Sequence, residues 1–166
     1  RDARAMIEWS VQLLSSQARA LFTRLAVFTG GAFSPAVAAV CHDPESPNDD
    51  VRGALDELVE SRLVGRTDGL AAEPRYTMLE TVREFALERL AASHEADRLR
   101  RAHARYFVAY AALPKPFLLS VHDAAWVARV DQDYGNFTAA LRWTLERQES
   151  EMALRLACAL WPYWQD

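Results

Sequence analysis

Residues 75–90 constrain the fold of this chain more than any other stretch. They begin with a short strand-like segment that ends at Met78. Thr77-x-x-Glu80 has the form of a capping box, in which a hydroxyl and a carboxylate satisfy free amides at a helix N-terminus. Apolar residues then recur at helical spacing, namely Leu79, Val82, Phe85, Ala86 and Leu90. The stretch therefore predicts a strand entering an amphipathic helix, with Leu79 as the first buried residue of its apolar face.

The segments before this stretch predict helices and a hairpin. Helical patterns cover about residues 3–14, 15–28, 34–41 and 50–63, with Ser15 and Asp49 or Asp50 as N-caps. Gly30-Gly31 ends the second helix, because glycine adopts the left-handed cap conformation without a Cβ penalty. Two apolar segments around Asp68-Gly69 predict the hairpin. Three helices followed by a hairpin is the element order of a winged helix.

Only helical patterns follow from about residue 95. We expect Leu113-Pro114-Lys115-Pro116 and Gly135-Asn136 to break this region into helices, including one at about residues 122–131. Antiparallel helices with short connections are typical of a helical-repeat array. The predicted fold is mainly α: a winged-helix domain with a two-stranded β-hairpin and linking helix at 1–92, then tetratricopeptide-like (TPR-like) antiparallel helical hairpins at 93–166.

Composition and charge argue against several functions. The chain has 166 residues, 51% of them hydrophobic and 25% charged, with a net charge of −4. It contains no apolar run near the roughly 20 residues that span a bilayer, so we expect a cytoplasmic protein without a membrane partner. The first residue is not methionine, and we expect the chain to be part of a longer protein.

No catalytic or metal-binding pattern is present in the sequence. It lacks a G-x-x-x-x-G-K-[ST] phosphate loop and a G-x-S-x-G elbow, so we predict a chain without enzyme activity or a cofactor of its own. Cys41 and Cys158 have neither CxxC nor metal spacing and are predicted to be free, buried thiols. The four histidines likewise do not form a metal-ligand set.

Several motifs, in order along nearly the whole chain, resemble one family. The chain is similar to the region after the nucleotide-binding domain in STAND-class (NB-ARC-like) P-loop ATPases, especially bacterial LuxR-type and related actinobacterial transcriptional regulators. The resemblance rests on Trp9-Ser10-x-x-Leu13-Leu14-Ser15, Leu21-Phe22-x-x-Leu25-Ala26-Val27-Phe28-x-Gly30-Gly31, Leu55-x-x-Leu58-Val59-x-Ser61-x-Leu63-Val64, Arg75-Tyr76-x-Met78-Leu79-Glu80-Thr81-Val82-Arg83-Glu84-Phe85-Ala86 and Asn136-Phe137-x-Ala139-Ala140-Leu141-x-Trp143.

This resemblance implies a non-catalytic module that relays nucleotide state between an ATPase core and a helical sensor array. ATP or ADP and Mg²⁺ are then expected in an upstream domain, which would be an intramolecular partner together with further helical repeats. An unidentified protein or small-molecule inducer is also expected, and DNA is reached only through another domain. Met78, Leu79 and Glu80 correspond to nucleotide-proximal positions. Related switches often have Met-His-Asp there, and Leu79 cannot replace a histidine that donates to a phosphate.

Two alternative functions stay open. The winged helix could itself bind DNA as a transcription-factor domain, or the module could belong to a nucleotide cyclase-type signalling enzyme. Charge argues against DNA binding, because phosphate contacts need clustered Lys and Arg. Residues 50–62, the recognition-helix position, carry four acidic and two basic residues, a net of −2, and residues 63–76 carry two of each.

Overall fold

The computed structural model describes residues 2–69, 73–113 and 124–165. The chain divides into two compact units, Arg1–Leu99 and Arg100–Asp166. Both units are mainly helical, which confirms the predicted fold class of a mainly α chain with a winged-helix domain. The TPR-like character of the second unit stays a prediction. The predicted domain boundary, between a winged-helix domain at 1–92 and a helical-repeat domain at 93–166, stays a prediction. Among the described residues, no helix has both the length and the apolar character needed to cross a bilayer.

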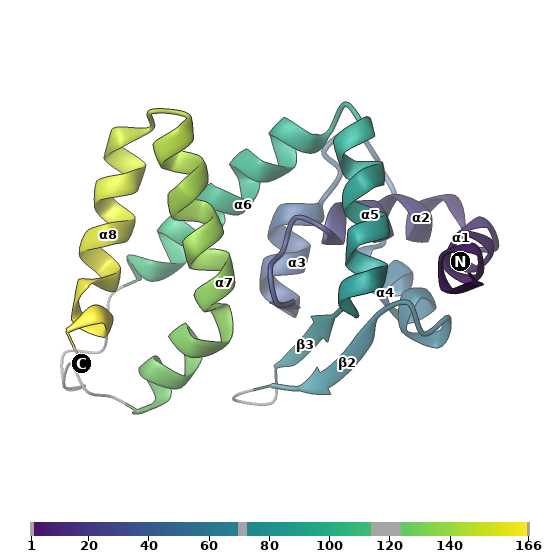
Figure 1. Cartoon of the computed structure of the whole chain (residues 1–166), viewed down its shortest axis with the longest axis horizontal. Coiled ribbons are helices and arrows are strands. Elements are labelled where there is room, and N and C mark those ends of the chain that lie inside the picture. Colours follow the sequence, from purple (N-terminus) through teal and green to yellow (C-terminus); the bar gives the residue numbers. More distant parts are fainter. Residues whose placement is uncertain (1, 70–72, 114–123, 166) are drawn as a thin grey trace. The chain divides into compact units, whose positions relative to one another are not determined.

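The first unit is a winged helix (Figure 1). Its elements in chain order are α1 (Asp2–Gln12), α2 (Ser16–Leu25), β1 (Ala32–Phe33), α3 (Ser34–Cys41), α4 (Val51–Glu60), β2 (Gly65–Asp68), β3 (Pro74–Thr77) and α5 (Glu80–Ala92). The predicted cap of α2 is present, since Ser15 Oγ accepts a hydrogen bond from the Ala18 amide at 3.2 Å. Asp50 caps α4 in the same way, accepting from the Gly53 amide at 2.9 Å.

The sheet has a third strand that the sequence pattern does not predict. The strand order is β1-β3-β2, and both pairings are antiparallel. Gly30 and Gly31, with φ of +76° and +88°, turn the chain so that Ala32 pairs with Tyr76. Helix α2 ends at Leu25 with Ala26 as its C-cap, so the prediction that the glycine pair ends this helix is wrong. The pair instead brings β1 to the hairpin and closes the small sheet.

The core of the first unit lies where α2 packs against α4 and α5. Apolar residues at helical spacing on these three helices are fully or almost fully buried, among them Leu21, Phe22, Leu55, Leu58, Phe85 and Leu90. Burial of a large aliphatic or aromatic side chain stabilises a fold by about 1.5–3 kcal/mol. This packing holds α4 and α5 against α2.

The N-terminus of α5 differs from the prediction. Its N-cap is Leu79, no side chain caps it, and Thr77 instead belongs to β3, so the predicted capping box is wrong. Leu79 is 74% exposed, which also contradicts its predicted burial. Strand β3 pairs as far as Thr77, and this sheet pairing overrides the local capping motif.

The second unit contains most of α6 (Ala96–Ala111), α7 (Ala124–Glu146) and α8 (Ser150–Trp164). The predicted break at Gly135-Asn136 is wrong, because α7 runs through it without interruption. Asn136 is fully buried there, where it accepts from His103 Nε2 at 3.1 Å and donates to Asp133 Oδ1 at 3.3 Å. Buried polar partners thus compensate for a poor helix former. The predicted break around Pro114 and the helix start at His122 lie outside the described residues.

Candidate functional site

Helix α4 occupies the recognition-helix position of the winged helix. One face of α4 is buried through Ala54, Leu55 and Leu58. The opposite face exposes Arg52, Asp56 and Glu60, two acids against one base. A helix that docks in a DNA groove needs positive charge to offset the phosphates. The exposed face of α4 has the opposite sign.

Another acid of α4, Glu57, is hydrogen-bonded to a neighbouring helix. Glu57 accepts hydrogen bonds from the amide and from the hydroxyl of Ser15, both at 2.7 Å. Ser15 is the N-cap of α2, so these bonds tie the start of α2 to the recognition-helix position. One of the acidic residues of α4, Glu57, therefore helps to hold the fold together.

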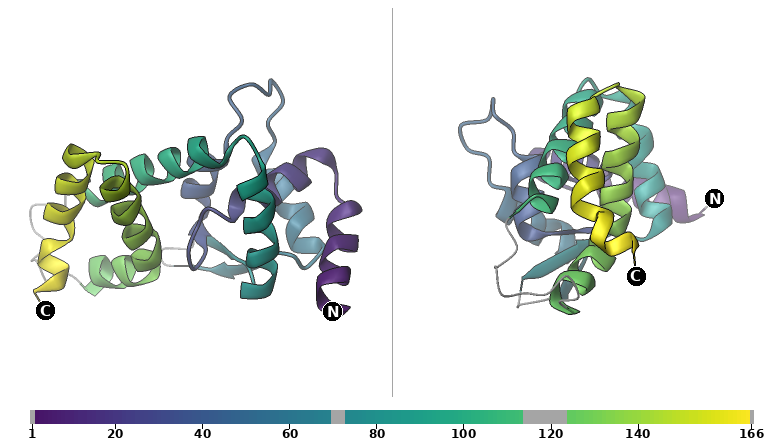
Figure 2. Two further views of the ribbon diagram at one scale, coloured as in Figure 1. Left: turned by 45° about the horizontal axis from the view of Figure 1, so that its top comes forward. Right: turned by 90° about the vertical axis from the view of Figure 1, so that its left-hand side faces the viewer.

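The loop at residues 42–50, which we call the acidic loop, precedes α4. Both views in Figure 2 show this segment standing out from the helices of the first unit. Asp49 organises it, accepting from His42 Nδ1 at 2.8 Å and from the Asp43 amide at 2.7 Å. The loop adds four acidic residues beside α4, namely Asp43, Glu45, Asp49 and Asp50.

Arg24 of α2 lies under the acidic loop, and only 8% of its side chain is exposed. Its Nε and Nη2 donate to the two carboxylate oxygens of Glu95 at 3.0 and 2.7 Å. Nη2 also donates to Asp43 Oδ2 at 3.2 Å. The hydrogen bond from Arg24 lowers the pKa of Glu95. The pKa of Asp43 is lowered mainly by a hydrogen bond from the Glu45 amide and to a smaller extent by Arg24. Both carboxylates are thus stabilised in the charged form.

A second surface lies at the base of the hairpin. An open hollow of about 370 Å³ is lined by residues from the end of α4 and the turn after it, from β2, and from the end of β3 and its connection to α5. Its apolar lining includes Val59, Val64, Met78 and the exposed Leu79, and its basic residues are Arg62 and Arg66, both exposed. The hollow combines apolar and positive character, in contrast to α4.

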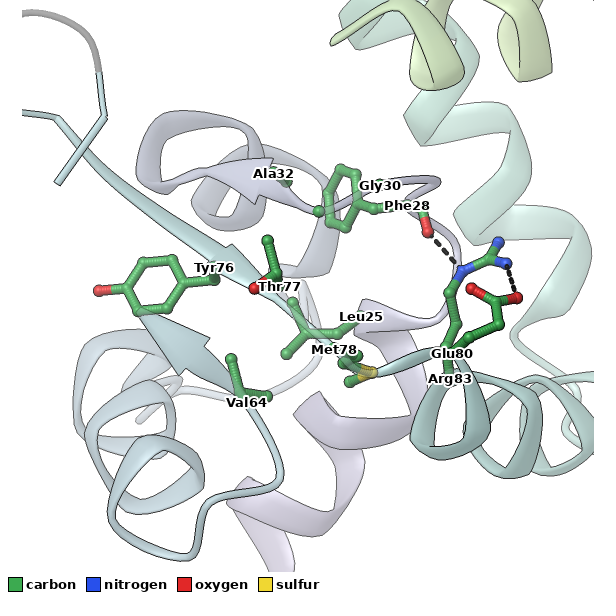
Figure 3. Close-up of a pocket in the computed structure, with 11 residues that line it drawn as sticks. Leu25, Phe28, Gly30, Ala32, Val64, Tyr76, Thr77, Met78, Glu80 and Arg83 are labelled. Atoms are coloured by element: carbon green, nitrogen blue, oxygen red, sulfur yellow. Dashed lines mark hydrogen bonds and ion pairs between the residues drawn. The ribbon is translucent and has the colours of Figure 1, made fainter. Parts of the chain in front are cut away.

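The three consecutive residues predicted to lie near a nucleotide differ in their surroundings. Met78 lines a small pocket of about 50 Å³ with Leu25 and Val64, as Figure 3 shows. Leu79 is exposed at the hollow beside the hairpin, and Glu80 pairs with Arg83 at 3.6 Å. Arg83 also donates to the Phe28 carbonyl at 2.8 Å, which anchors the first turns of α5 to the turn after α2 (Figure 3).

The cysteines differ in environment. Cys41 is buried, as predicted, and burial raises its pKa to about 12, which makes the thiol a poor nucleophile at neutral pH. Cys158 on α8 is exposed, which contradicts the predicted burial. In the described part of the chain, no group of three or more His, Cys, Asp or Glu side chains is placed to hold a metal ion.

Comparison with known proteins identifies the winged helix. Residues 14–91 match the family described as winged helix-turn-helix domain. The chain is 38% identical over 161 residues to a protein of Mycobacterium tuberculosis named "Putative HTH-type transcriptional regulator" and equally to one of the same name from Mycobacterium bovis. These alignments cover 97% of this chain but only 18% of each regulator. An uncharacterized protein of Mycobacterium tuberculosis is 38% identical over 94 residues, 56% of this chain and 24% of that protein. No solved structure matches the chain significantly.

Proposed function

We propose, with the winged helix-turn-helix domain at residues 14–91 as the premise, that this chain is a module of a transcriptional regulator. In this proposal the winged helix relays a signal through protein contacts, and another domain of the regulator binds DNA. The main support is the acidic exposed face of α4 beside the acidic loop. DNA would repel this surface, whereas a basic protein surface would attract it.

The base of the hairpin is the proposed contact with a nucleotide-binding domain that carries ATP or ADP and Mg²⁺. Leu79 is exposed at the rim of the hollow, and leucine offers apolar contact but no hydrogen-bond donor. The backbone amides at the start of α5 lack a side-chain cap and supply donors beside it. We therefore assign Leu79 to contact with the neighbouring domain, and Met78 and Glu80 to holding this end of α5 in place.

The second unit is the proposed start of a TPR-like helical array. Its antiparallel α7 and α8 pack on each other through regularly spaced apolar residues. Further helical repeats would continue such an array. The proposed role of the array is to receive a protein or small-molecule inducer, whose signal reaches the ATPase domain by way of the winged helix.

Direct DNA binding by this winged helix is the second candidate function. The domain match and the names of the mycobacterial relatives support it more directly than the ATPase relay, because none of these names mentions an ATPase. Arg52, Arg62 and Arg66 are exposed and would have to supply the phosphate contacts. The acids around them make this the weaker candidate on physical grounds.

The two candidates differ in what happens when acids on α4 are neutralised. The experiment uses the full-length regulator with Asp56→Asn and Glu60→Gln together, and measures its DNA retention and its inducer-dependent transcription in parallel. Relay through protein contacts predicts altered inducer response with unchanged DNA retention. The matched control, Glu84→Gln on the exposed side of α5, should change neither.

Stronger DNA retention in the double variant would contradict the relay. It would mean that α4 lies against phosphates, since loss of two negative charges would then reduce repulsion. An unchanged inducer response would also contradict the relay, because the acidic face would then have no role in transmitting the signal.

A further inference from the structure

We propose that Arg24 and Arg98 couple the acidic loop to the joint between α5 and α6, residues 93–95, so that loop and joint loosen together. The acidic loop lies next to α4, and the joint lies directly before α6, which leads into the second unit. The inference goes beyond the proposed function, because it concerns a device within the first unit and holds whichever partner the winged helix meets.

Arg24 makes the first connection. It reaches Glu95 at the joint with two donors, at 3.0 and 2.7 Å, and the same Nη2 that donates to Glu95 also donates to Asp43 of the loop. A planar guanidinium that donates to two carboxylates holds them at a set distance from each other and stabilises their ionised form. The loop and the joint are therefore held by one nearly buried group.

Arg98 makes a parallel connection from the first turn of α6. Its Nη2 donates to Glu95 Oε1 at 2.9 Å, and its Nη1 donates to the His42 carbonyl at 3.5 Å. Glu95 is thus shared by two guanidinium groups, and each of them also contacts the start of the acidic loop. Two independent side chains span the same pair of segments.

The charges of this cluster balance, with Arg24 and Arg98 against Asp43 and Glu95. Loss of either carboxylate leaves an excess positive charge around Arg24, whose side chain is 8% exposed. An uncompensated buried charge is strongly unfavourable, and the cluster lowers its free energy by opening to water. Such opening separates the loop from the joint, so a change on one side weakens the other. Coupling of this kind is reciprocal.

Amide hydrogen exchange on the whole 166-residue chain tests this coupling. Asp43→Asn changes the loop and is measured at the joint, and Glu95→Gln changes the joint and is measured at the loop. We expect exchange at the Ser93, Glu95 and Leu99 amides to speed up about threefold to tenfold in Asp43→Asn, and the Asp43 and Ser46 amides to respond likewise in Glu95→Gln. Core amides at Phe22 and Leu58 should keep their protection.

Two controls remove one negative charge each without touching the arginines. Glu45→Gln lies in the same loop and Glu84→Gln on α5, and both side chains are exposed. Neither should alter exchange at the opposite segment. An effect of Asp43→Asn confined to its own loop would overturn the proposal, as would a control with the same remote effect.

A measurement on the unaltered chain decides the matter if a variant fails to fold. Native-state exchange in low denaturant resolves opening reactions. The loop amides of Asp43 and Ser46 and the joint amides of Ser93 and Glu95 should share one opening, with a single rate and denaturant dependence. Separate openings of the two segments would overturn the coupling.

Discussion

At the scale of single residues, Leu79 and Leu90 lie at opposite ends of the α5 region and differ in environment. Leu79 is the N-cap of α5 and is 74% exposed, whereas Leu90 is fully buried near the C-terminal end of α5. Periodicity alone gives the two leucines the same role. Their difference follows from the sheet, because β3 continues to Thr77 and leaves Leu79 outside the helix.

This difference predicts unequal effects of the same substitution. Leu79→Ala should change the free energy of unfolding by less than about 0.5 kcal/mol, because an exposed side chain loses little on truncation. Leu90→Ala should cost about 2–5 kcal/mol through lost burial and a cavity. Urea unfolding of both variants checks the pair. Comparable losses would mean that Leu79 is buried in the folded chain.

Charge at the Arg24 cluster predicts a pH-dependent stability, to which Glu95 contributes. The pKa of Glu95 is lowered from 4.5 by its bond to Arg24, so this interaction stabilises the fold fully above about pH 4.5. The stabilisation is lost as the pH falls through the lowered pKa, because the folded protein must then bind a proton.

Glu95→Gln should therefore be less stable than the unaltered chain at pH 7, and the gap should shrink towards pH 3. Chemical unfolding at a series of pH values measures this gap. Glu84→Gln, which is exposed, should show no such trend. A gap that stays constant with pH would show that Glu95 does not stabilise the fold through its charge.

At the scale of elements, β1 shows how two glycines build a sheet. A Cβ on Gly31 would lie 2.5 Å from the Tyr76 carbonyl oxygen, whereas one on Gly30 would meet nothing within 4 Å. Both residues have positive φ, so both disfavour a side chain. Only at Gly31 must the side chain also be absent so that the backbone can come close to β3.

The matched pair Gly30→Ala and Gly31→Ala separates these two requirements. Gly30→Ala should cost about 1–2 kcal/mol, the penalty of a left-handed conformation. Gly31→Ala should cost about 1–3 kcal/mol more, because the backbone of β3 must shift. Denaturant unfolding gives both values. Equal costs would show that β1 does not depend on this close approach.

Prediction from sequence succeeded for elements whose signals are local and failed where distant partners decide. Ser15 and Asp50 cap their helices as their types indicate. The Thr77 capping box loses to sheet pairing, and Gly135-Asn136 does not break α7 because His103 and Asp133 bind Asn136. Strand β1 is two residues long and exists only through pairing with β3.

For the candidate site as well, the sequence predicts local features but not contacts between distant residues. The negative charge of α4 can be counted along the sequence, because a helix exposes residues at known spacing. The exposed Leu79 and the hollow beside it depend on how β3 meets α5. The Arg24–Glu95 contact joins residues 71 positions apart, and no local pattern predicts it.

At the scale of the whole molecule, the central claim is that this winged helix serves protein contacts rather than DNA. The most direct measurement is a titration of a labelled DNA duplex with the 166-residue chain at about 0.15 M salt, followed by fluorescence anisotropy. A variant with Asp56→Lys and Glu60→Lys is the matched control. It changes the net charge of residues 50–62 from −2 to +2, since each replacement adds two units.

The account predicts no binding by the unaltered chain up to about 100 µM, the weak end of non-specific DNA affinity. The lysine variant should gain measurable affinity that falls as salt rises, which shows that the assay detects a winged helix on DNA. Micromolar binding by the unaltered chain, with the same steep salt dependence, would contradict the central claim.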